Sequence, residues 1–253
     1  MVTALLPLPR LQGAAELLDR RDNPDEEIRE SLRDLERLNR YFGGVRTVLL
    51  HLGRMVGTSS QCPITILDIA TGGADIPRAI CRWARKRRLT VAIEAVDYGD
   101  QVLAAATESS ADFPEIRLRR VRAPLLPYPD HSFDYVISSL FFHHLSEADG
   151  ILLLREMARV ARRGLLVNDL LRSRLACLLT AMTTRLLSGN RLTRHDGPIS
   201  VLSGFRPEEL RRMATAAGLT DTRLSRHLWF RVALVFTQVD RLKAKVRPFS
   251  LNT

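Results

Sequence analysis

A run of β-prone residues that leads directly into a turn of small residues constrains the fold of this chain more than any other feature. Residues 64–69 read Ile-Thr-Ile-Leu-Asp-Ile, and Ala-Thr-Gly-Gly-Ala follows at 70–74. A helix is predicted from Ile76 and Pro77 onward, because apolar residues then recur at the spacing of a helix face that packs on a sheet. A strand, a glycine turn and a helix N-terminus together form a site that suits a nucleotide-like ligand.

Predicted strands and helices alternate after this turn. Strands are expected at 64–69, 91–96, 116–121, 133–139 and 164–168, with helices between them that include 150–160. A helix from Pro207 to Ala217, with Gly218 at its far end, precedes two β-prone runs at 222–229 and 231–238 that read as a hairpin. This order predicts an α/β fold with a doubly wound, Rossmann-like, seven-stranded sheet that ends in an antiparallel hairpin.

The segment before the sheet is predicted to be helical. Asn23 is the expected N-cap and Pro24 the first helical residue, and acidic residues follow in the first turn. Apolar residues at steps of three and four between positions 28 and 52 predict a buried stripe, which Gly43 and Gly44 divide into two helices. This helical segment either covers the mouth of a ligand site or packs against the edge of the sheet.

These elements suggest three regions. We expect residues 1–57 to form an N-terminal helical cap and residues 58–240 to form the main domain. Residues 170–204 would be an insertion within it, with a helix over 170–187 and a loop over 188–204 that is rich in Gly, Arg and Asp. Residues 241–253 form a basic tail that we expect to be disordered.

The composition limits the partners. The net charge is +10, but all but three of the 38 basic residues are arginines, a bias that coding composition produces without any nucleic-acid partner. No nucleic-acid partner is favoured. No apolar run approaches the ~20 residues that span a bilayer, and the proline-interrupted opening does not read as a signal peptide. Cys62, Cys81 and Cys177 are scattered, so we expect no disulfide framework, no zinc site and a cytoplasmic location.

The acidic residue Asp97 ends the second strand about twenty residues after the glycine turn, where a carboxylate suits a ribose diol. Enzymes that bind NAD share this arrangement with class I methyltransferases. The later segment 126–145, Leu-Pro-Tyr-Pro-Asp-His-Ser-Phe-Asp-Tyr-Val-Ile-Ser-Ser-Leu-Phe-Phe-His-His-Leu, resembles the fourth-strand signature of class I S-adenosylmethionine-dependent methyltransferases. The resemblance covers residues 64–169. Segments 35–40, 167–173 and 194–200 are similar to a bacterial subgroup that accompanies polyketide or phenolic-lipid biosynthesis.

The resemblance implies S-adenosylmethionine as cofactor and S-adenosylhomocysteine as product. Asp68 would orient the turn, residues 70–74 would approach the cofactor by their backbone, Asp97 would bind the ribose and Tyr98 would lie on the adenine. The full expected set is Asp68, Ala70, Thr71, Gly72, Gly73, Ala74, Asp97, Tyr98, Arg122, Ala123, Ser139 and Leu140. The chain departs from the family twice. Alanines replace the outer glycines of GxGxG, and Arg122 stands where the family has an aspartate that accepts a hydrogen bond from the adenine amino group.

His143 and His144 follow the fourth strand, and Asp169 ends the fifth. In related natural-product sugar methyltransferases a His-His pair and an acid at these positions have acid–base roles, so the resemblance implies such roles here, above all for His143. A histidine of pKa ~6.5 can take the proton of a phenol of pKa ~10 during methyl transfer. The predicted function is therefore the transfer of a methyl group to an oxygen atom of a small phenolic or polyketide-like acceptor.

Further residues are candidates for contacts with this acceptor. Phe42, Met182 and Leu186 would supply an apolar lid. His195 and Asp196 are either a second acid–base pair or an ordinary turn before Gly-Pro, and the turn is favoured. Asn168 and Asp169 are adjacent oxygen ligands without a third, so no metal is predicted.

Two other functions remain open. The basic charge is compatible with an RNA methyltransferase, although no RNA-binding module and no Asn/Asp-Pro-Pro-Tyr segment is present. The departures at Ala70, Ala74 and Arg122 are compatible with a non-catalytic protein of the same fold that binds a ligand or a partner.

Overall fold

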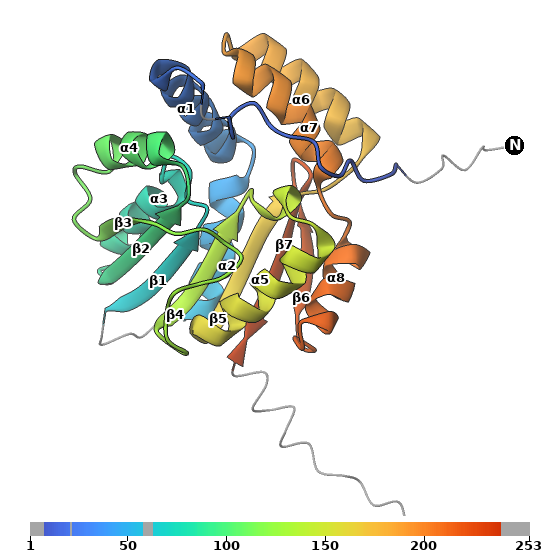
Figure 1. Cartoon of the computed structure of the whole chain (residues 1–253). Coiled ribbons are helices and arrows are strands. Elements are labelled where there is room, and N and C mark those ends of the chain that lie inside the picture. Colours follow the sequence, from blue (N-terminus) through green and yellow to red (C-terminus); the bar gives the residue numbers. More distant parts are fainter. Residues whose placement is uncertain (1–7, 21, 58–62, 239–253) are drawn as a thin grey trace, which may run out of the picture.

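A seven-stranded sheet forms the centre of the molecule (Figure 1). The computed structural model describes residues 8–20, 22–57 and 63–238. The strand order is β3-β2-β1-β4-β5-β7-β6, in which β7 runs antiparallel to both β5 and β6 and the first five strands are parallel. This arrangement confirms the predicted doubly wound sheet with its C-terminal hairpin. The strands are β1 (Ile64–Ile69), β2 (Val91–Asp97), β3 (Ile116–Arg120), β4 (Phe133–Ser139), β5 (Ala161–Leu170), β6 (Arg223–His227) and β7 (Arg231–Thr237).

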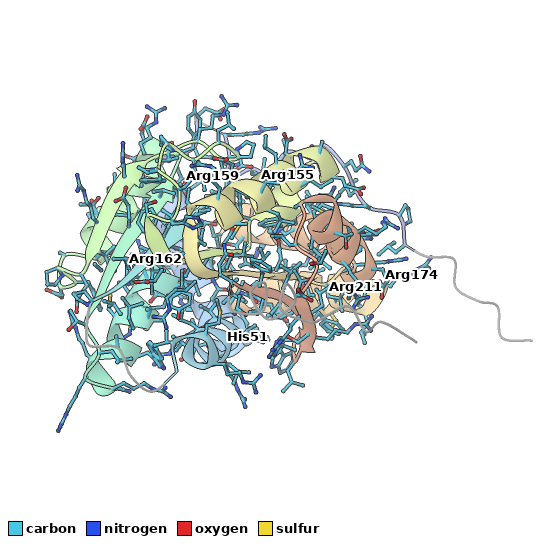
Figure 2. All side chains as sticks on the ribbon, turned by 90° about the horizontal axis from the view of Figure 1, so that it is seen from below. His51, Arg155, Arg159, Arg162, Arg174 and Arg211 are labelled. Carbon is cyan, nitrogen blue, oxygen red and sulfur yellow. The ribbon has the colours of Figure 1, made fainter. Side chains whose placement is uncertain are left out.

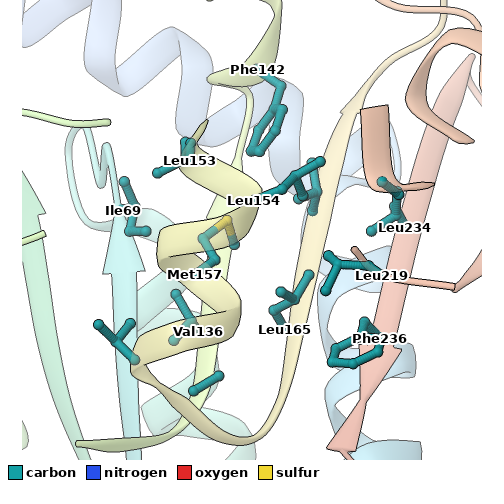
Figure 3. Packing of buried hydrophobic residues seen from close by; sticks show 14 of the residues in the cluster. Ile69, Val136, Phe142, Leu153, Leu154, Met157, Leu165, Leu219, Leu234 and Phe236 are labelled. Atoms are coloured by element: carbon teal, nitrogen blue, oxygen red, sulfur yellow. The ribbon is translucent and has the colours of Figure 1, made fainter. Parts of the chain in front are cut away.

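Helices cover both faces of this sheet. Successive side chains of a strand point to opposite faces. Leu166 therefore packs with α2 (Gly44–Val56) and α3 (Asp75–Lys86), whereas its neighbours Leu165 and Val167 pack with α5 (Glu147–Val160) and α8 (Pro207–Ala216). Figure 3 shows the second cluster, in which Leu154 and Met157 of α5 lie over Val136 and Leu165. The nearly continuous apolar sequence of the central strands is explained by this burial on both faces.

A third group of helices lies beyond the carboxyl ends of the parallel strands. It consists of α1 (Asp25–Tyr41), α6 (Arg174–Leu187) and α7 (Arg191–Ser203), with residues 8–20 running between them (Figure 1). Ile28 and Leu32 of α1 pack on Leu192 of α7. The short helix η1 (Phe142–His144) follows β4 at this end, and α4 (Asp100–Ser109) follows β2. These elements cover the edge of the sheet at which ligands bind in doubly wound folds.

The predicted loop at 188–204 is wrong, because most of it forms α7. The side chain of Asn190 caps this helix by accepting hydrogen bonds from the backbone N–H groups of Leu192 and Thr193, at 2.9 and 3.2 Å. Gly197 lies so close to α6 that a Cβ there would be 2.9 Å from the Thr184 methyl carbon. Gly197 and Pro198 are residues that commonly interrupt helices. Both lie inside α7, whose packing against α6 requires a small residue at position 197.

The predicted start of α1 is also wrong in detail. Pro24 occupies the N-cap position and Asp25 is the first helical residue. The Asn23 side chain does not cap the helix; its amide donates to the carbonyl oxygens of Leu17 and Arg20 and so ties the preceding segment to α1. The predicted break holds, because Gly43 adopts φ +80° between α1 and α2.

Two predictions concern residues that the structure does not describe. These residues are the tail at 241–253 and Cys62. Among the helices that the structure describes, none is both long and apolar enough to cross a bilayer. The arginines labelled in Figure 2 belong to four elements, α5, β5, α6 and α8, so the basic charge is not confined to one of them.

Candidate active site

The glycine turn after β1 has the backbone that the cofactor prediction requires. Ala70, Gly72 and Ala74 all have positive φ, between 54° and 56°. The Thr71 N–H donates to Val96 O at 2.9 Å, and the Ala74 N–H donates to Thr71 O at 3.0 Å. Left-handed backbone costs a non-glycine residue about 1–2 kcal/mol, so the turn keeps its geometry at two alanines in spite of that cost.

Asp97 fastens this turn to the end of β2. One carboxylate oxygen accepts from the Gly72 N–H at 3.0 Å, and the other accepts from the N–H groups of Tyr98 at 2.7 Å and Gly99 at 3.1 Å. Burial raises the pKa of Asp97. Burial and the neighbouring carboxylates of Asp75 and Asp97 raise the pKa of Asp68 to about 8. The predicted acids thus meet at the carboxyl ends of β1 and β2.

The side chain of Tyr98 lies at the outer end of this site. Tyr98 is 39% exposed, and the guanidinium carbons of Arg120 and Arg122 lie 4.9 and 5.1 Å from its ring centroid. Arg122, in place of the family's aspartate, therefore stacks on the residue that was expected to lie on an adenine. Ala123 follows it in the chain.

A buried polar chain lies at the inner end of the site. Asp75 directly follows the glycine turn and accepts a hydrogen bond from the Asn39 amide at 2.9 Å. The Asn39 oxygen accepts from Arg231 Nη2 at 3.0 Å. Gly44 leaves room for this oxygen, since a Cβ there would be 2.4 Å from it. Arg231 is 3% exposed, and its Nε and Nη1 have no hydrogen-bond partner among the described residues. Burial lowers its pKa to about 10.

His143 is held by two carboxylates. Its Nδ1 lies 2.7 Å from Asp169 Oδ1, and its backbone N–H donates to Asp169 Oδ2 at 2.9 Å. Its Nε2 faces Glu16 Oε1 at 3.5 Å. Burial opposes the charged imidazole, but Asp169 and Glu16 outweigh it and raise the pKa of His143 to about 10. His143 therefore carries a positive charge at neutral pH in this arrangement.

His144 and Glu16 complete the cluster. His144 Nε2 lies 3.8 Å from Glu16 Oε2, and Nδ1 lies 3.4 Å from Asp19 Oδ2. The Ser200 hydroxyl donates to Glu16. A cavity of about 270 Å³ adjoins the cluster and is lined by residues 10–14, Glu16, residues 143–146 and Ser203. The three predicted catalytic residues, His143, His144 and Asp169, therefore lie together beside a space for a small molecule.

Ser139 and Leu140 lie where β4 ends. The Ser139 hydroxyl accepts from the Asn168 amide at 2.8 Å, and the Leu140 N–H donates to Asn168 O at 2.9 Å. Leu140 also has positive φ, 57°. Asn168 thus links the ends of β4 and β5 between the cofactor turn and the histidine cluster.

The predicted turn at His195 and Asp196 is wrong. Both residues lie in the middle of α7. The two oxygens of Asp196 accept from the backbone N–H groups of Leu17 at 2.8 Å and Leu18 at 2.9 Å. His195 Nδ1 lies 2.7 Å from the same carboxylate. Asp196 therefore anchors the segment that carries Glu16.

The predicted lid residues are dispersed. Phe42 packs edge-on against Trp229, with ring centroids 5.1 Å apart. Met182 and Leu186 are 50% and 78% exposed on α6. They share an exposed apolar face of this helix with Leu175, Leu178, Leu179 and Leu187.

Glu16, Asn39 and Arg231 are the residues that sequence reasoning missed. Each reaches the site through a contact distant in sequence, such as that between Arg231 and Asn39, 192 positions apart. Asn39 lies in segment 35–40, to which the resemblance gave no role, and no motif surrounds Glu16 or Arg231. The sequence gives Glu16 no signal beyond its acidic side chain.

Comparisons with known proteins agree with the sheet and the turn. Residues 67–167 match the family described as a methyltransferase domain. A ubiquinone/menaquinone biosynthesis C-methyltransferase of Rickettsia akari is 36% identical over 73 residues, 28% of this chain and 29% of that protein. A demethylmenaquinone methyltransferase of Bacillus licheniformis is 32% identical over 100 residues, 40% of this chain and 41% of that protein. The chain therefore matches less than half the length of either relative.

A solved structure resembles most of the chain. The crystal structure of a SAM-dependent methyltransferase from Aquifex aeolicus superposes with a TM-score of 0.60 at 16% identity. It covers 83% of this chain and 97% of that one. This likeness shows the fold.

Proposed function

We propose that this chain, which contains a methyltransferase domain and has the class I methyltransferase fold, transfers a methyl group from S-adenosylmethionine to a small phenolic or polyketide-like acceptor. The observation that carries the proposal is the position of the His143–Asp169 pair. It lies beside a cavity, at the same edge of the sheet as the glycine turn and Asp97. A cofactor site and an acid–base site are thereby adjacent.

The residues present fit the proposed cofactor. Asp97 can accept one hydroxyl hydrogen bond from a ribose diol beyond its three backbone contacts, since a carboxylate offers about four lone-pair directions. At the outer end, an adenine would contact the group formed by Tyr98 and the guanidinium groups of Arg120 and Arg122. At the inner end, the two unpartnered N–H groups of Arg231 suit the carboxylate of the methionine moiety, because a buried donor without a partner is costly.

S-adenosylmethionine supplies an activated methyl group when it is bound. The side chains of this protein would prepare the acceptor. Asp169 fixes the His143 ring through Nδ1, so Nε2 is directed toward Glu16 beside the cavity. The positive charge held there favours the anionic form of an acceptor hydroxyl, which is the reactive form of a phenol. Glu16 and His144 remain to receive its proton. Helices α1, α6 and α7 would limit the access of water.

Arg231 provides a test of the cofactor site. We expect Arg231→Leu to weaken the binding of S-adenosylhomocysteine by roughly tenfold or more, because a charge-assisted contact to its carboxylate is lost. 5′-Methylthioadenosine lacks that carboxylate and should bind equally well to both proteins. The variant also leaves Asn39 Oδ1 without its buried donor and should lower thermal stability, so both affinities are measured well below the melting temperatures of the two proteins. Equal losses for both ligands would contradict this role.

The acceptor atom is proposed to be oxygen, and ring carbon is the second candidate. Carbon is a candidate because the Rickettsia akari relative is a ubiquinone/menaquinone biosynthesis C-methyltransferase. Both reactions begin with an ionised hydroxyl group. Incubation of the protein with methyl-¹³C-labelled S-adenosylmethionine and a panel of hydroxylated aromatics distinguishes them, because methoxy and ring-methyl carbons have different NMR shifts. No transfer to any member of the panel would count against the proposed acceptor class.

A further inference from the structure

We propose that Glu16, His143 and His144 bind a divalent transition-metal ion, with zinc the best match to the donor set. Two imidazoles and one carboxylate are a known set of protein ligands for zinc, with a fourth position left for water or substrate. Their donor atoms lie within 4.8 Å of one another. The site does not depend on methyl transfer, but its role in catalysis rests on the proposed function.

The distances within the cluster suit a shared ion better than direct hydrogen bonds. His143 Nε2 lies 3.5 Å from one Glu16 oxygen, and His144 Nε2 lies 3.8 Å from the other. An N–H···O hydrogen bond is about 2.7–3.2 Å long. Two ligands at about 2.1 Å from a tetrahedral ion are about 3.4 Å apart, close to the first of these separations.

The side chains around the cluster orient the ligands. Asp169 Oδ1 holds His143 Nδ1 at 2.7 Å, the carboxylate–histidine contact that commonly supports a metal-bound imidazole. This contact directs Nε2 toward Glu16, where an ion would take the place of the imidazolium proton. Ser200 donates to Glu16 Oε1, the oxygen that faces His143, and so helps to fix the carboxylate. The rings of His143 and His144 lie 4.3 Å apart and are inclined by 32°, so both can face one point.

The charges and the open side of the cluster also suit an ion. Glu16 and Asp169 together carry two negative charges in a buried position, which a divalent cation would neutralise. Nitrogen donors favour zinc or cobalt over magnesium or calcium, which prefer oxygen ligands. The cavity of about 270 Å³ leaves room for a fourth ligand.

The ion would have a defined part in the proposed reaction. With the ion bound, Glu16 and His144 would be its ligands, so an acceptor hydroxyl at the fourth position would lose its proton to solvent, and more readily because the cation would stabilise the oxyanion. The oxygen then attacks the methyl carbon, the carbon–sulfur bond breaks, and the sulfur keeps the electron pair. The products are the methylated acceptor and S-adenosylhomocysteine.

The test uses the full-length, untagged chain, stripped with a chelator and then loaded with zinc sulfate or cobalt chloride. We expect one zinc per chain by mass spectrometry after gel filtration, and visible absorption bands of four-coordinate cobalt. Glu16→Gln and His144→Asn should weaken zinc binding by at least about tenfold. His227→Asn is the matched control, because His227 pairs with His51 and Ser225 and not with a carboxylate among the described residues, and it should leave binding unchanged.

Several results would overturn the inference. They are a stoichiometry well below one, cobalt absorption typical of a hydrated ion, or equal zinc binding by the wild type, Glu16→Gln and His144→Asn. The first two use the wild-type protein and so do not depend on the folding of a variant. Binding of S-adenosylhomocysteine to the same stripped protein is measured separately. If it binds while zinc does not, the metal site fails and the proposed function stands.

Discussion

Two histidine pairs in this molecule have opposite electrostatic surroundings. His143 and His144 lie at the carboxyl ends of the parallel strands and face Glu16, Asp19 and Asp169. His51 of α2 and His227 of β6 approach each other at 2.8 Å, and both contact the Ser225 hydroxyl. His51 is marked in Figure 2.

The carboxylates decide what each pair can do. They raise the pKa of His143 to about 10 against the effect of burial. Burial, His227 and Arg54 instead lower the pKa of His51 to about 4. The buried residues His143 and His51 therefore differ in charge at neutral pH, and His143 adjoins a cavity with acids beside it. Neighbouring carboxylates, rather than burial alone, therefore determine which of these two buried histidines is charged at neutral pH.

The largest expected effect separates the two pairs by activity. His143→Ala should lower turnover by about 10²–10³-fold, the range for loss of one group that stabilises a developing oxyanion. His227→Ala should leave turnover within about twofold of the wild type. Steady-state rates with labelled S-adenosylmethionine and an acceptor from the panel measure both. Similar losses in the two variants would remove the functional distinction between the pairs.

Asp169→Asn should have the next largest effect. The variant keeps the shape of the side chain but removes the charge that orients His143, so turnover should fall by about 10–100-fold. The dissociation constant of S-adenosylhomocysteine should remain nearly unchanged, because Asp169 is assigned to the acceptor side of the site. A parallel loss of cofactor affinity and of the melting temperature would mean that Asp169 is structural.

The second pair should affect stability below neutral pH. Between pH 6.5 and 4 the unfolded chain protonates His51 while the folded chain does not, so the free energy of unfolding falls as the pH is lowered. Urea denaturation at pH 7 and pH 4.5 measures this loss. The wild type should lose about 1–3 kcal/mol more than His51→Gln over this interval. Equal losses in the two proteins would show that His51 does not titrate abnormally.

The smallest expected effect is a rise in the pKa values of His51 and His227 when a carboxylate is placed beside them. Ser225→Asp places a carboxylate beside His51 and His227, and a nearby opposite charge favours the imidazolium. The pKa values of both rings should rise by about 1–2 units, measured by NMR titration of the ring C–H signals. An unchanged pKa for both rings would show that burial, not the lack of a carboxylate, controls this pair.

The strands and the cofactor turn could be predicted because their signals are local. Apolar runs gave β4 its observed bounds, Phe133–Ser139. β5 begins earlier than predicted because Arg162 and Arg163 interrupt the apolar pattern at its start, although both lie within the strand, at an irregularity of its pairing with β4 between Ala161 and Gly164. Asp97 and Asp169 were found because each directly follows the apolar run of a strand.

The rest of the site depends on contacts that no local pattern encodes. Glu16 reaches His143 from a segment without regular structure, and the α7 residue Asp196 holds that segment in place. α7 itself was missed because Gly197 was read as a break, whereas it fits against Thr184 of α6. Tertiary packing overrode the local signal at these positions.

The most direct test of the account is calorimetric titration of S-adenosylhomocysteine into the wild-type protein and His143→Ala. The account predicts one binding site per chain in both proteins, with dissociation constants within about twofold of each other, because the cofactor turn and the histidine cluster are separate parts of the site. No heat and no thermal shift in the wild type at millimolar ligand would contradict the account.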